Sequence, residues 1–413
     1  MLYAILLMQI FVGQSESSEN TVEKLSLAEK LFPDAELIWS KTFEGKIIDF
    51  DIAEKSGHVI LGAIKDRKGY VYFFSPDGKL LWTKENAEHS EIKKCAGIRV
   101  SVSDSAETIG IFWWGDYEYE EVQVYDISGE KLYAYDHGMS GSGVEISPGG
   151  GYVKHAWFFD KTGKQIILRE ILKGLPIEKL WDGKRYRDIT ISKFDFVSEN
   201  ELVILLDNVL YFYSFPEGEL IWKSQKLALE NGGGITIQGK YILINARNLL
   251  YCFNKNGELL WKQKWEIVRI NAVSISSDEK YMAINAIVSK GRKFLLCDSK
   301  TGEIKLSTDK LESQIGVKNF LCLEGKVLVS GYTGSHIHDN HKGYWTYILH
   351  FDDNWNIINE SYERGLVMGT YDSPIITVYV SDATDITKTG YQEGPLRYEN
   401  STVFTVDVLK IRD

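Results

Sequence analysis

The sequence contains little cysteine and little proline, with four cysteines and seven prolines among 413 residues. The cysteines show no C-x-x-C spacing, so the usual zinc-ribbon and redox-dithiol motifs are absent. Cys252 and Cys297 each precede the turn glycine of a repeat by five residues. Such equivalent positions are expected to lie farther apart than the roughly 7 Å that a disulfide allows between Cα atoms. We therefore expect buried, unpaired thiols at Cys95, Cys252, Cys297 and Cys322.

Clusters of basic residues are missing as well. The formal net charge is −11, from 58 acidic and 47 basic residues. Nucleic acids and anionic membranes require a concentrated positive surface, so neither is expected as a partner. Common enzyme motifs are also absent, because no P-loop, H-E-x-x-H or dinucleotide fingerprint is found. The nearest approach to a G-x-S-x-G elbow, at 138–142, ends in serine instead of glycine.

The apolar run from Leu2 to Val12 is too short to cross a bilayer, which takes roughly 20 residues. Small residues at Gly13 and Ser15 and a polar stretch follow it, a pattern typical of a secretory signal peptide. No Lys or Arg precedes the run, so a hydrophobic N-terminal tail is the alternative. We expect export to the periplasm, the cell surface or the exterior, without stable membrane insertion.

A four-residue phrase recurs along the rest of the chain. It ends in tryptophan at five places and in another residue at three more, with steps of 39 to 53 residues. Repeats of this length built from short strands predict a β-propeller, in which each unit is one four-stranded blade. The tryptophans are Trp39, Trp82, Trp181, Trp222 and Trp261, and the degenerate ends are Tyr133, Leu306 and Asn359.

One unit, residues 47–84, illustrates the repeat. Alternating β-branched and aromatic segments predict four strands, here called A to D, at 47–53, 58–65, 70–75 and 79–84. Turns rich in Gly, Pro, Asp and Asn separate them. The same pattern fits 98–137, 143–181, 190–224, 234–264, 271–308 and 317–361, and a last unit supplies three strands, near 366, at 375–380 and at 402–409.

The chain opens with a solitary strand at 36–43 and ends with a three-stranded unit. The simplest expectation is that the first strand completes the last blade, which closes the ring and hides two sheet edges. The expected fold class is all-β, an eight-bladed β-propeller, or a seven-bladed one if the atypical unit 143–181 forms no blade. The predicted domains are a signal peptide at 1–15, a linker with a short helix at 16–35 and the propeller at 36–413.

The recurring tryptophans have a structural explanation. A large flat side chain on the outer strand can wedge against the adjacent blade and bury about 150–250 Å². Since each repeat contacts only its neighbours, such wedges hold a ring together. Ligand binding is the alternative role. We interpret them as structural anchors of the repeat: Trp39, Trp82, Trp181, Trp222 and Trp261.

The segments Tyr70 to Trp82 and Tyr251 to Trp261 resemble the repeat of PQQ-like (quinoprotein-like) propellers. The resemblance covers the C–D hairpins throughout 36–411 and implies the propeller fold. That class includes quinoprotein alcohol dehydrogenases and the propeller lipoprotein of the bacterial outer-membrane assembly machinery. The adjacent cysteine pair that lies against the quinone in the dehydrogenases is absent here, and so is the lipoprotein cysteine. The resemblance therefore does not imply PQQ as a cofactor.

Long connections fall between strands B and C and between successive units, at 84–97, 114–121, 333–345 and 382–401. By strand alternation they share one rim, the long-loop face, which we predict to be the binding surface. Aromatic residues beside carboxylates suit a carbohydrate or peptide ligand, and rings packed over the blade ends are the alternative. The aromatic candidates are Trp113, Trp114, Tyr117, Tyr119, Tyr344, Trp345 and Tyr391.

Two further groups carry candidate chemistry. His336, His338 and His341 are residue types that bind divalent metals, and a solvated polar hairpin is the alternative. No other cofactor is expected. Asp49 and Asp51 on a first strand are candidates for acid–base chemistry in the central channel, or for solvated channel lining.

Two functions stay open at this level. The favoured one is a monomeric, non-catalytic scaffold that binds a protein or a cell-surface polymer through the long-loop face. The alternative is an enzyme with its site at the channel mouth, either a quinone-dependent oxidoreductase or a glycan-active enzyme. The fold alone does not decide between them, because propellers host many activities.

Overall fold

The computed structural model describes residue 32 and residues 35–86, 95–115, 120–136, 143–155, 157–176, 194–229, 233–276, 278–289, 291–308, 315–323, 325–333, 343–364, 366–369, 375–381 and 403–410. The expected signal peptide and the linker, apart from Phe32 and Ala35, lie outside the described residues. Phe32 is buried, and the ammonium of Lys326 lies 4.9 Å from its ring centre.

The described strands form eight antiparallel sheets, seven of four strands and one of three. The first three sheets are β2 (Lys46–Ile52), β3 (Val59–Lys65), β4 (Lys68–Phe74) and β5 (Leu80–Glu85); β6 (Cys95–Val102), β7 (Thr108–Gly115), β8 (Glu120–Asp126) and β9 (Lys131–Asp136); and β10 (Glu145–Ile146), β11 (Tyr152–Lys154) and β12 (Phe158–Asp160).

The next four sheets are β13 (Phe194–Ser198), β14 (Glu201–Leu206), β15 (Val209–Ser214) and β16 (Leu220–Lys223); β17 (Gly234–Gln238), β18 (Tyr241–Ala246), β19 (Leu249–Asn254) and β20 (Leu259–Lys264); β21 (Arg269–Ile275), β22 (Tyr281–Val288), β23 (Gly291–Asp298) and β24 (Ile304–Thr308); and β25 (Ile315–Leu323), β26 (Lys326–Thr333), β27 (Gly343–Phe351) and β28 (Ile357–Arg364).

The eighth sheet joins the two ends of the chain. Its order is β1 (Glu36–Glu44), β31 (Val403–Lys410), β30 (Ile375–Ser381) and β29 (Leu366–Gly369). Trp39 pairs with Val408 in the ladder between β1 and β31. Only Gly45 separates β1 from β2 of the first sheet, and its φ of +113° lies in a region that glycine adopts at little cost. The N-terminal strand thus adds to the C-terminal strands, the pairing expected from the sequence.

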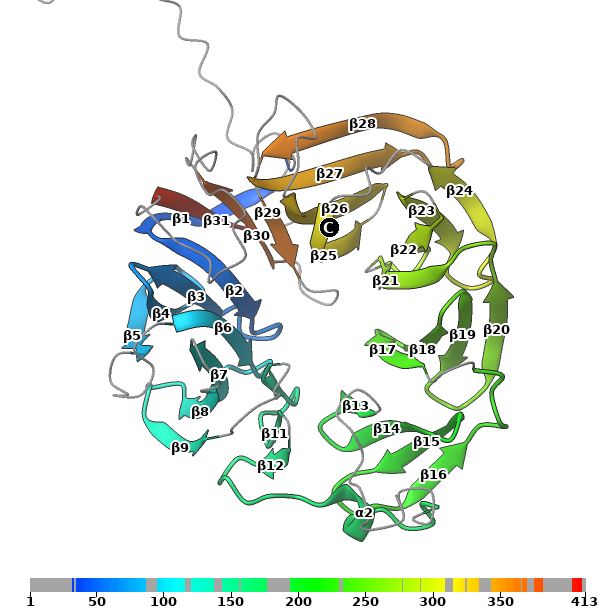
Figure 1. Cartoon of the computed structure of the whole chain (residues 1–413), viewed down its shortest axis with the longest axis horizontal. Helices are drawn as coiled ribbons and strands as arrows, with labels where there is room; N and C mark the ends of the chain where they lie inside the picture. Colours follow the sequence, from blue (N-terminus) through cyan, green and yellow to red (C-terminus); the bar gives the residue numbers. More distant parts are fainter. Residues whose placement is uncertain are drawn as a thin grey trace, which may run out of the picture.

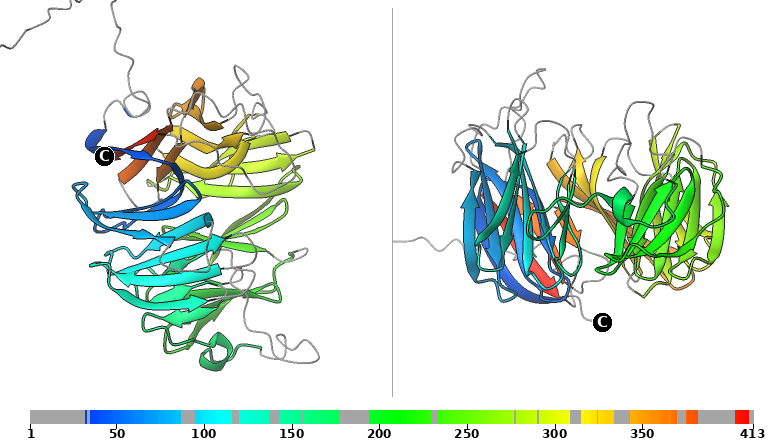
Figure 2. Two further views of the ribbon diagram at one scale, coloured as in Figure 1. Left: turned by 60° about the vertical axis from the view of Figure 1, so that its left-hand side comes forward. Right: turned by 90° about the horizontal axis from the view of Figure 1, so that it is seen from below.

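The sheets follow one another in chain order around a central opening (Figure 1). In each four-strand unit the first strand lies nearest the centre and the fourth lies outermost, as β17 to β20 show clearly. The views in Figure 2 show the strands running across the thickness of the ring. We call the first strand of each unit the inner strand and the fourth the outer strand.

The third unit departs from the four strands predicted at 143–181. Its strands have two or three residues, and a single bridge from Phe159 to Gln165 follows β12. The chain then forms helix α2 (Leu168–Ile171). Leu168 is the buried residue of this short helix, and Leu172 and Leu175, which follow the helix, are buried as well. Trp181 lies outside the described residues.

The outer strands share a β-bulge directly before the anchor position. In the fifth sheet Cys252 pairs with Trp261 and Phe253 with Leu259, so Leu260 is the extra residue. The same register shift occurs in β1, β5, β9, β16, β24 and β28. Leu259 and Leu260 are both exposed while Trp261 is buried. A bulge on an edge strand also opposes pairing with another chain.

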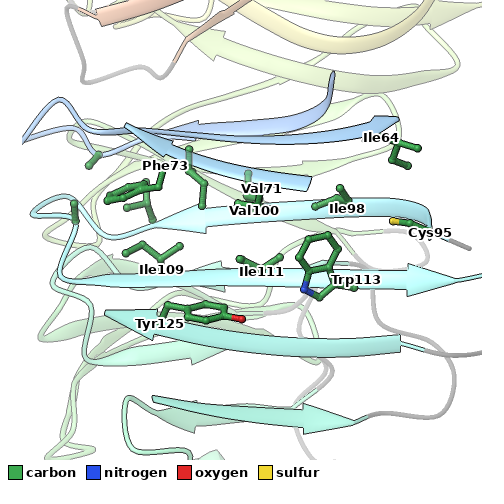
Figure 3. Close-up of a cluster of buried hydrophobic side chains, with 14 residues drawn as sticks. Ile64, Val71, Phe73, Cys95, Ile98, Val100, Ile109, Ile111, Trp113 and Tyr125 are labelled. Atoms are coloured by element: carbon green, nitrogen blue, oxygen red, sulfur yellow. The ribbon is translucent and has the colours of Figure 1, made fainter. Parts of the chain in front are cut away.

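The hydrophobic core lies between successive sheets. Figure 3 shows the cluster between the first and second sheets, where Val71 and Phe73 of β4 face Ile98 and Val100 of β6, with Trp113 of β7 in the same cluster. The four cysteines are buried and form no disulfide, as predicted. Burial raises the pKa of the Cys252 thiol to about 12.

Candidate functional site

Asp49 and Asp51 lie on inner strand β2 and connect it to inner strand β6. Asp49 accepts a hydrogen bond from the backbone N–H of Val100 at 3.0 Å and pairs with the Arg99 guanidinium at 3.2 Å. Asp51 accepts one from the N–H of Val102 at 2.9 Å. Hydrogen bonds from backbone amides to a carboxylate are among the stronger kinds. Both side chains therefore link the first sheet to the second.

The electrostatic setting of Asp51 is unusual for a carboxyl group. Burial raises the pKa of Asp51 to about 7, with smaller increases from Asp49 and Glu54 and opposing effects from two backbone amides. A carboxyl group with this pKa exchanges its proton near neutral pH, as an acid–base catalyst does. However, Oδ1 accepts from the N–H of Ile52 and Oδ2 from that of Val102. Both oxygens are thus engaged in holding backbone.

The same kind of contact recurs around the inner wall. A polar side chain on one inner strand accepts a hydrogen bond from a backbone N–H of the next inner strand. The pairs are Ser101 Oγ with the N–H of Ile146 at 3.0 Å, Gln238 Oε1 with that of Ile275 at 2.7 Å, and Ser274 Oγ with that of Cys322 at 3.1 Å. The sequence analysis missed this network, although polar residues at alternate inner-strand positions are its signal.

The anchor tryptophans reach across to the C–D turn of the following sheet. The indole N–H groups donate to turn carbonyls in three cases: Trp82 to Ile127 at 3.1 Å, Trp222 to Lys255 at 2.9 Å and Trp261 to Ser299 at 2.9 Å. Trp39 is also buried, but the structure shows no acceptor for its N–H. Trp82, Trp222 and Trp261 therefore each hold their own sheet to the next one at its outer edge.

A glycine with positive φ lies against each of these rings. An added Cβ at Gly257 would stand 2.6 Å from Cδ2 of Trp222, and the same proximity relates Gly78 to Trp39, Gly129 to Trp82 and Gly302 to Trp261. The turn therefore requires glycine for its φ and for the close approach of the indole. At Gly218, however, the carbonyl oxygen of Ile171 in α2 takes the place of a ring, 2.3 Å from an added Cβ.

The predicted aromatic candidates differ in their surroundings. Trp113 is fully buried and donates its indole N–H to Gln123 Oε1 at 3.0 Å, so its ring lies inside the core and the expectation of an open binding face is wrong for it. Trp114 is half-buried and packs against Phe112 and Gly97. Tyr344 and Trp345 belong to β27, with side chains outside the described set. Tyr117, Tyr119 and Tyr391 lie outside the described residues.

The histidine candidates His336, His338 and His341 also lie outside the described residues. Among the residues that the structure describes, no group of three His, Cys, Asp or Glu side chains could hold a metal ion. No helix within those residues has the length and apolarity to cross a membrane.

On the rim opposite the long-loop face, the A–B turns of successive sheets contact one another. The carbonyl of Asp104 accepts from the N–H groups of Lys55 and Ser56, and the N–H of Asp104 donates to the carbonyl of Pro148. Farther along, Glu199 accepts from two amides of the glycine turn at 149–151. Lys240 forms an ion pair with Glu279 of the next sheet. These contacts bind successive A–B turns to one another.

Two solved structures are similar in fold. BamB from Moraxella catarrhalis has a TM-score of 0.52 and 13% identity, over 92% of this chain and 98% of that chain. The C-terminal WD40 domain of Sif2 has a TM-score of 0.54 and 10% identity, over 92% of this chain and 99% of that domain. The chain is a β-propeller repeat protein. No protein-family model matches it, and the comparison with curated protein sequences gives no match.

Proposed function

We propose that this propeller is a non-catalytic scaffold that binds a protein or a cell-surface polymer through its long-loop face. The observation that carries the proposal is the engagement of Asp49 and Asp51, the acidic pair best placed for chemistry in the channel, in hydrogen bonds that hold β6. Their carboxylate oxygens accept hydrogen bonds that hold one sheet to the next. The A–B rim is likewise committed to contacts between its own turns.

The proposed scaffold is a PQQ-like propeller of eight blades, closed by β1. The support is the pairing of β1 with β31 and the presence of eight sheets, of which the third is the irregular one. In a closed ring the strand ends that carry the long connections share one rim, and binding residues usually lie in such connections. We further propose export of the chain after cleavage of residues 1–15, because an apolar run from Leu2 to Val12 followed by small residues is typical of a signal peptide.

The binding proposal is tested with loop exchange. Residues 334–342, between β26 and β27, and residues 382–401 are replaced by Gly-Ser segments of equal length in the full chain, and capture of a partner enriched from the cell envelope is measured. The control is Leu260→Ser, which changes an exposed residue of the outer wall. We expect the exchanged chain to lose capture and the control to retain it. Undiminished capture by the exchanged chain contradicts the proposal.

A further inference from the structure

The junction between the third and fourth sheets contains two carboxylates and one ammonium group. The side chain of Lys154 on β11 is 6% exposed, and its Nζ lies 2.6 Å from Glu145 of β10 and 3.7 Å from Asp195 of β13. It also donates a hydrogen bond to the carbonyl of Phe194 at 3.1 Å. Lys154 is therefore the link from the irregular sheet to the next inner strand.

The charges at this junction do not balance. Glu145 and Asp195 together carry two negative charges when ionised, against the single positive charge of Lys154. Among the described elements packed against the group, β17 has no titratable residue, Arg169 of α2 pairs with Glu170 at 3.6 Å, and Arg99 of β6 pairs with Asp49 at 3.2 Å. One bound proton makes the group neutral. The Glu145 side chain is 62% exposed and the Asp195 side chain 34%. Water therefore stabilises the charge of Asp195 less than that of Glu145, and the proton binds to Asp195.

The surrounding structure makes this junction the place where an imbalance has the largest effect. The third sheet has the shortest strands of the described residues, and α2 lies beside the fourth sheet where an anchor ring would lie elsewhere (Figure 1). Short ladders resist local opening less than long ones. Aromatic packing of Tyr152 and Phe158 on Phe215 holds the outer part together.

We propose that this junction is a proton-operated joint, tightened when Asp195 binds a proton and loosened when its carboxylate is charged. The direction follows from linkage, because the closed joint holds the proton more strongly than an opened, solvated one. Burial raises the pKa of Asp195 to about 6, although Lys154 lowers it. Raising the pH through 6 therefore favours local opening between β11 and β13, and acid favours closure.

Hydrogen–deuterium exchange of the full chain from pH 5 to pH 8, corrected for intrinsic exchange, tests the joint. We expect protection of residues 145–160 to fall by about tenfold per pH unit until the pH reaches the pKa of Asp195 at about 6, and to level off above it. Residues 281–288 of β22 in the sixth sheet, which adjoins neither sheet of the joint, serve as the internal reference. Asp195→Asn should abolish this pH dependence and leave the segment protected throughout.

Two further variants separate the joint from a general effect of pH. Glu145→Gln removes the exposed carboxylate, leaves a balanced pair and should raise protection at pH 8. Asp51→Asn changes the inner wall elsewhere and should leave the pH response of 145–160 as it is. If Asp195→Asn keeps the response of the unmodified chain, or if residues 281–288 lose protection in parallel, the joint does not exist.

Discussion

The indole N–H of Trp261 donates a hydrogen bond to the carbonyl oxygen of Ser299, 2.9 Å away in the next sheet. Trp261→Phe keeps a ring at this position and removes the donor. We expect Trp261→Phe to lower the free energy of unfolding by about 0.5–1.5 kcal/mol through the lost hydrogen bond, and somewhat further because the phenyl ring is smaller than the indole. Trp261→Ala should lower the free energy of unfolding by about 3–5 kcal/mol. Urea unfolding measures both.

The matched control for that experiment is Trp39→Phe. The Trp39 side chain is equally buried, but the described structure gives its N–H no acceptor. Removing an unpaired buried donor costs nothing in hydrogen bonding. An equal loss of stability in Trp39→Phe and Trp261→Phe shows that the hydrogen bond contributes nothing.

A second prediction concerns the turn glycines. Gly257 has φ +85° and lies against the Trp222 ring, whereas Gly174 has φ +71° and no neighbouring atom within 4 Å of an added Cβ. Gly174→Ala should cost only the left-handed backbone, about 1–2 kcal/mol. Gly257→Ala should cost about 1–3 kcal/mol more, because the methyl group displaces the indole. Denaturant unfolding of the pair gives the difference, and equal costs refute close packing of the ring.

A third prediction concerns the pH dependence of stability. The pKa of Asp51 is about 7 in the folded chain and about 3.9 when unfolded, so the folded chain keeps a proton that the unfolded chain loses. The resulting stabilisation is complete below about pH 4 and disappears as the pH rises through 7. Asp51→Asn should remove this part of the slope. Unfolding midpoints of both chains at pH 5, 6.5 and 8 check it, and parallel curves contradict it.

A fourth prediction tests closure through β1. The pairing of β1 with β31 covers Glu36 to Glu44, so a chain that begins at Lys46 has an open edge along β31. We expect it to unfold at lower urea than the full chain and to aggregate more readily. A synthetic peptide of residues 35–45 should restore stability in trans, and a scrambled peptide should not. Equal stability of the truncated and full chains contradicts closure by β1.

The repeats were predictable where local signals agree with the fold. A continuous apolar run places β3 at Val59–Lys65, close to the predicted 58–65, because both faces of this strand are buried between sheets. The pairing of β1 with β31 also followed from counting strands. In the third unit the described residues form three short strands followed by helix α2, and the predicted strand ending at Trp181 lies outside the described residues.

The candidate site was less predictable, because exposure depends on neighbours that are distant in the chain. Trp113 stands beside Trp114 and near acidic residues, a pattern that suggested an open face, yet the first sheet covers it completely. The degenerate phrase ending at Leu306 also has an aromatic residue opposite it, in the C–D turn of the following sheet. At the turn position where other hairpins have glycine, the following sheet carries Trp355 with φ +66°, packed against Tyr281 and Phe351.

The sequence by itself determined the all-β repeat, its length and its turn chemistry, because strand periodicity and glycine-dependent turns are set by residues near one another in the chain. Only the tertiary structure decided that Asp51 holds the amide of Val102 and that Lys154 stands between two carboxylates. Those contacts join separate sheets. Their energies depend on distance and burial across the junction, which no local pattern specifies.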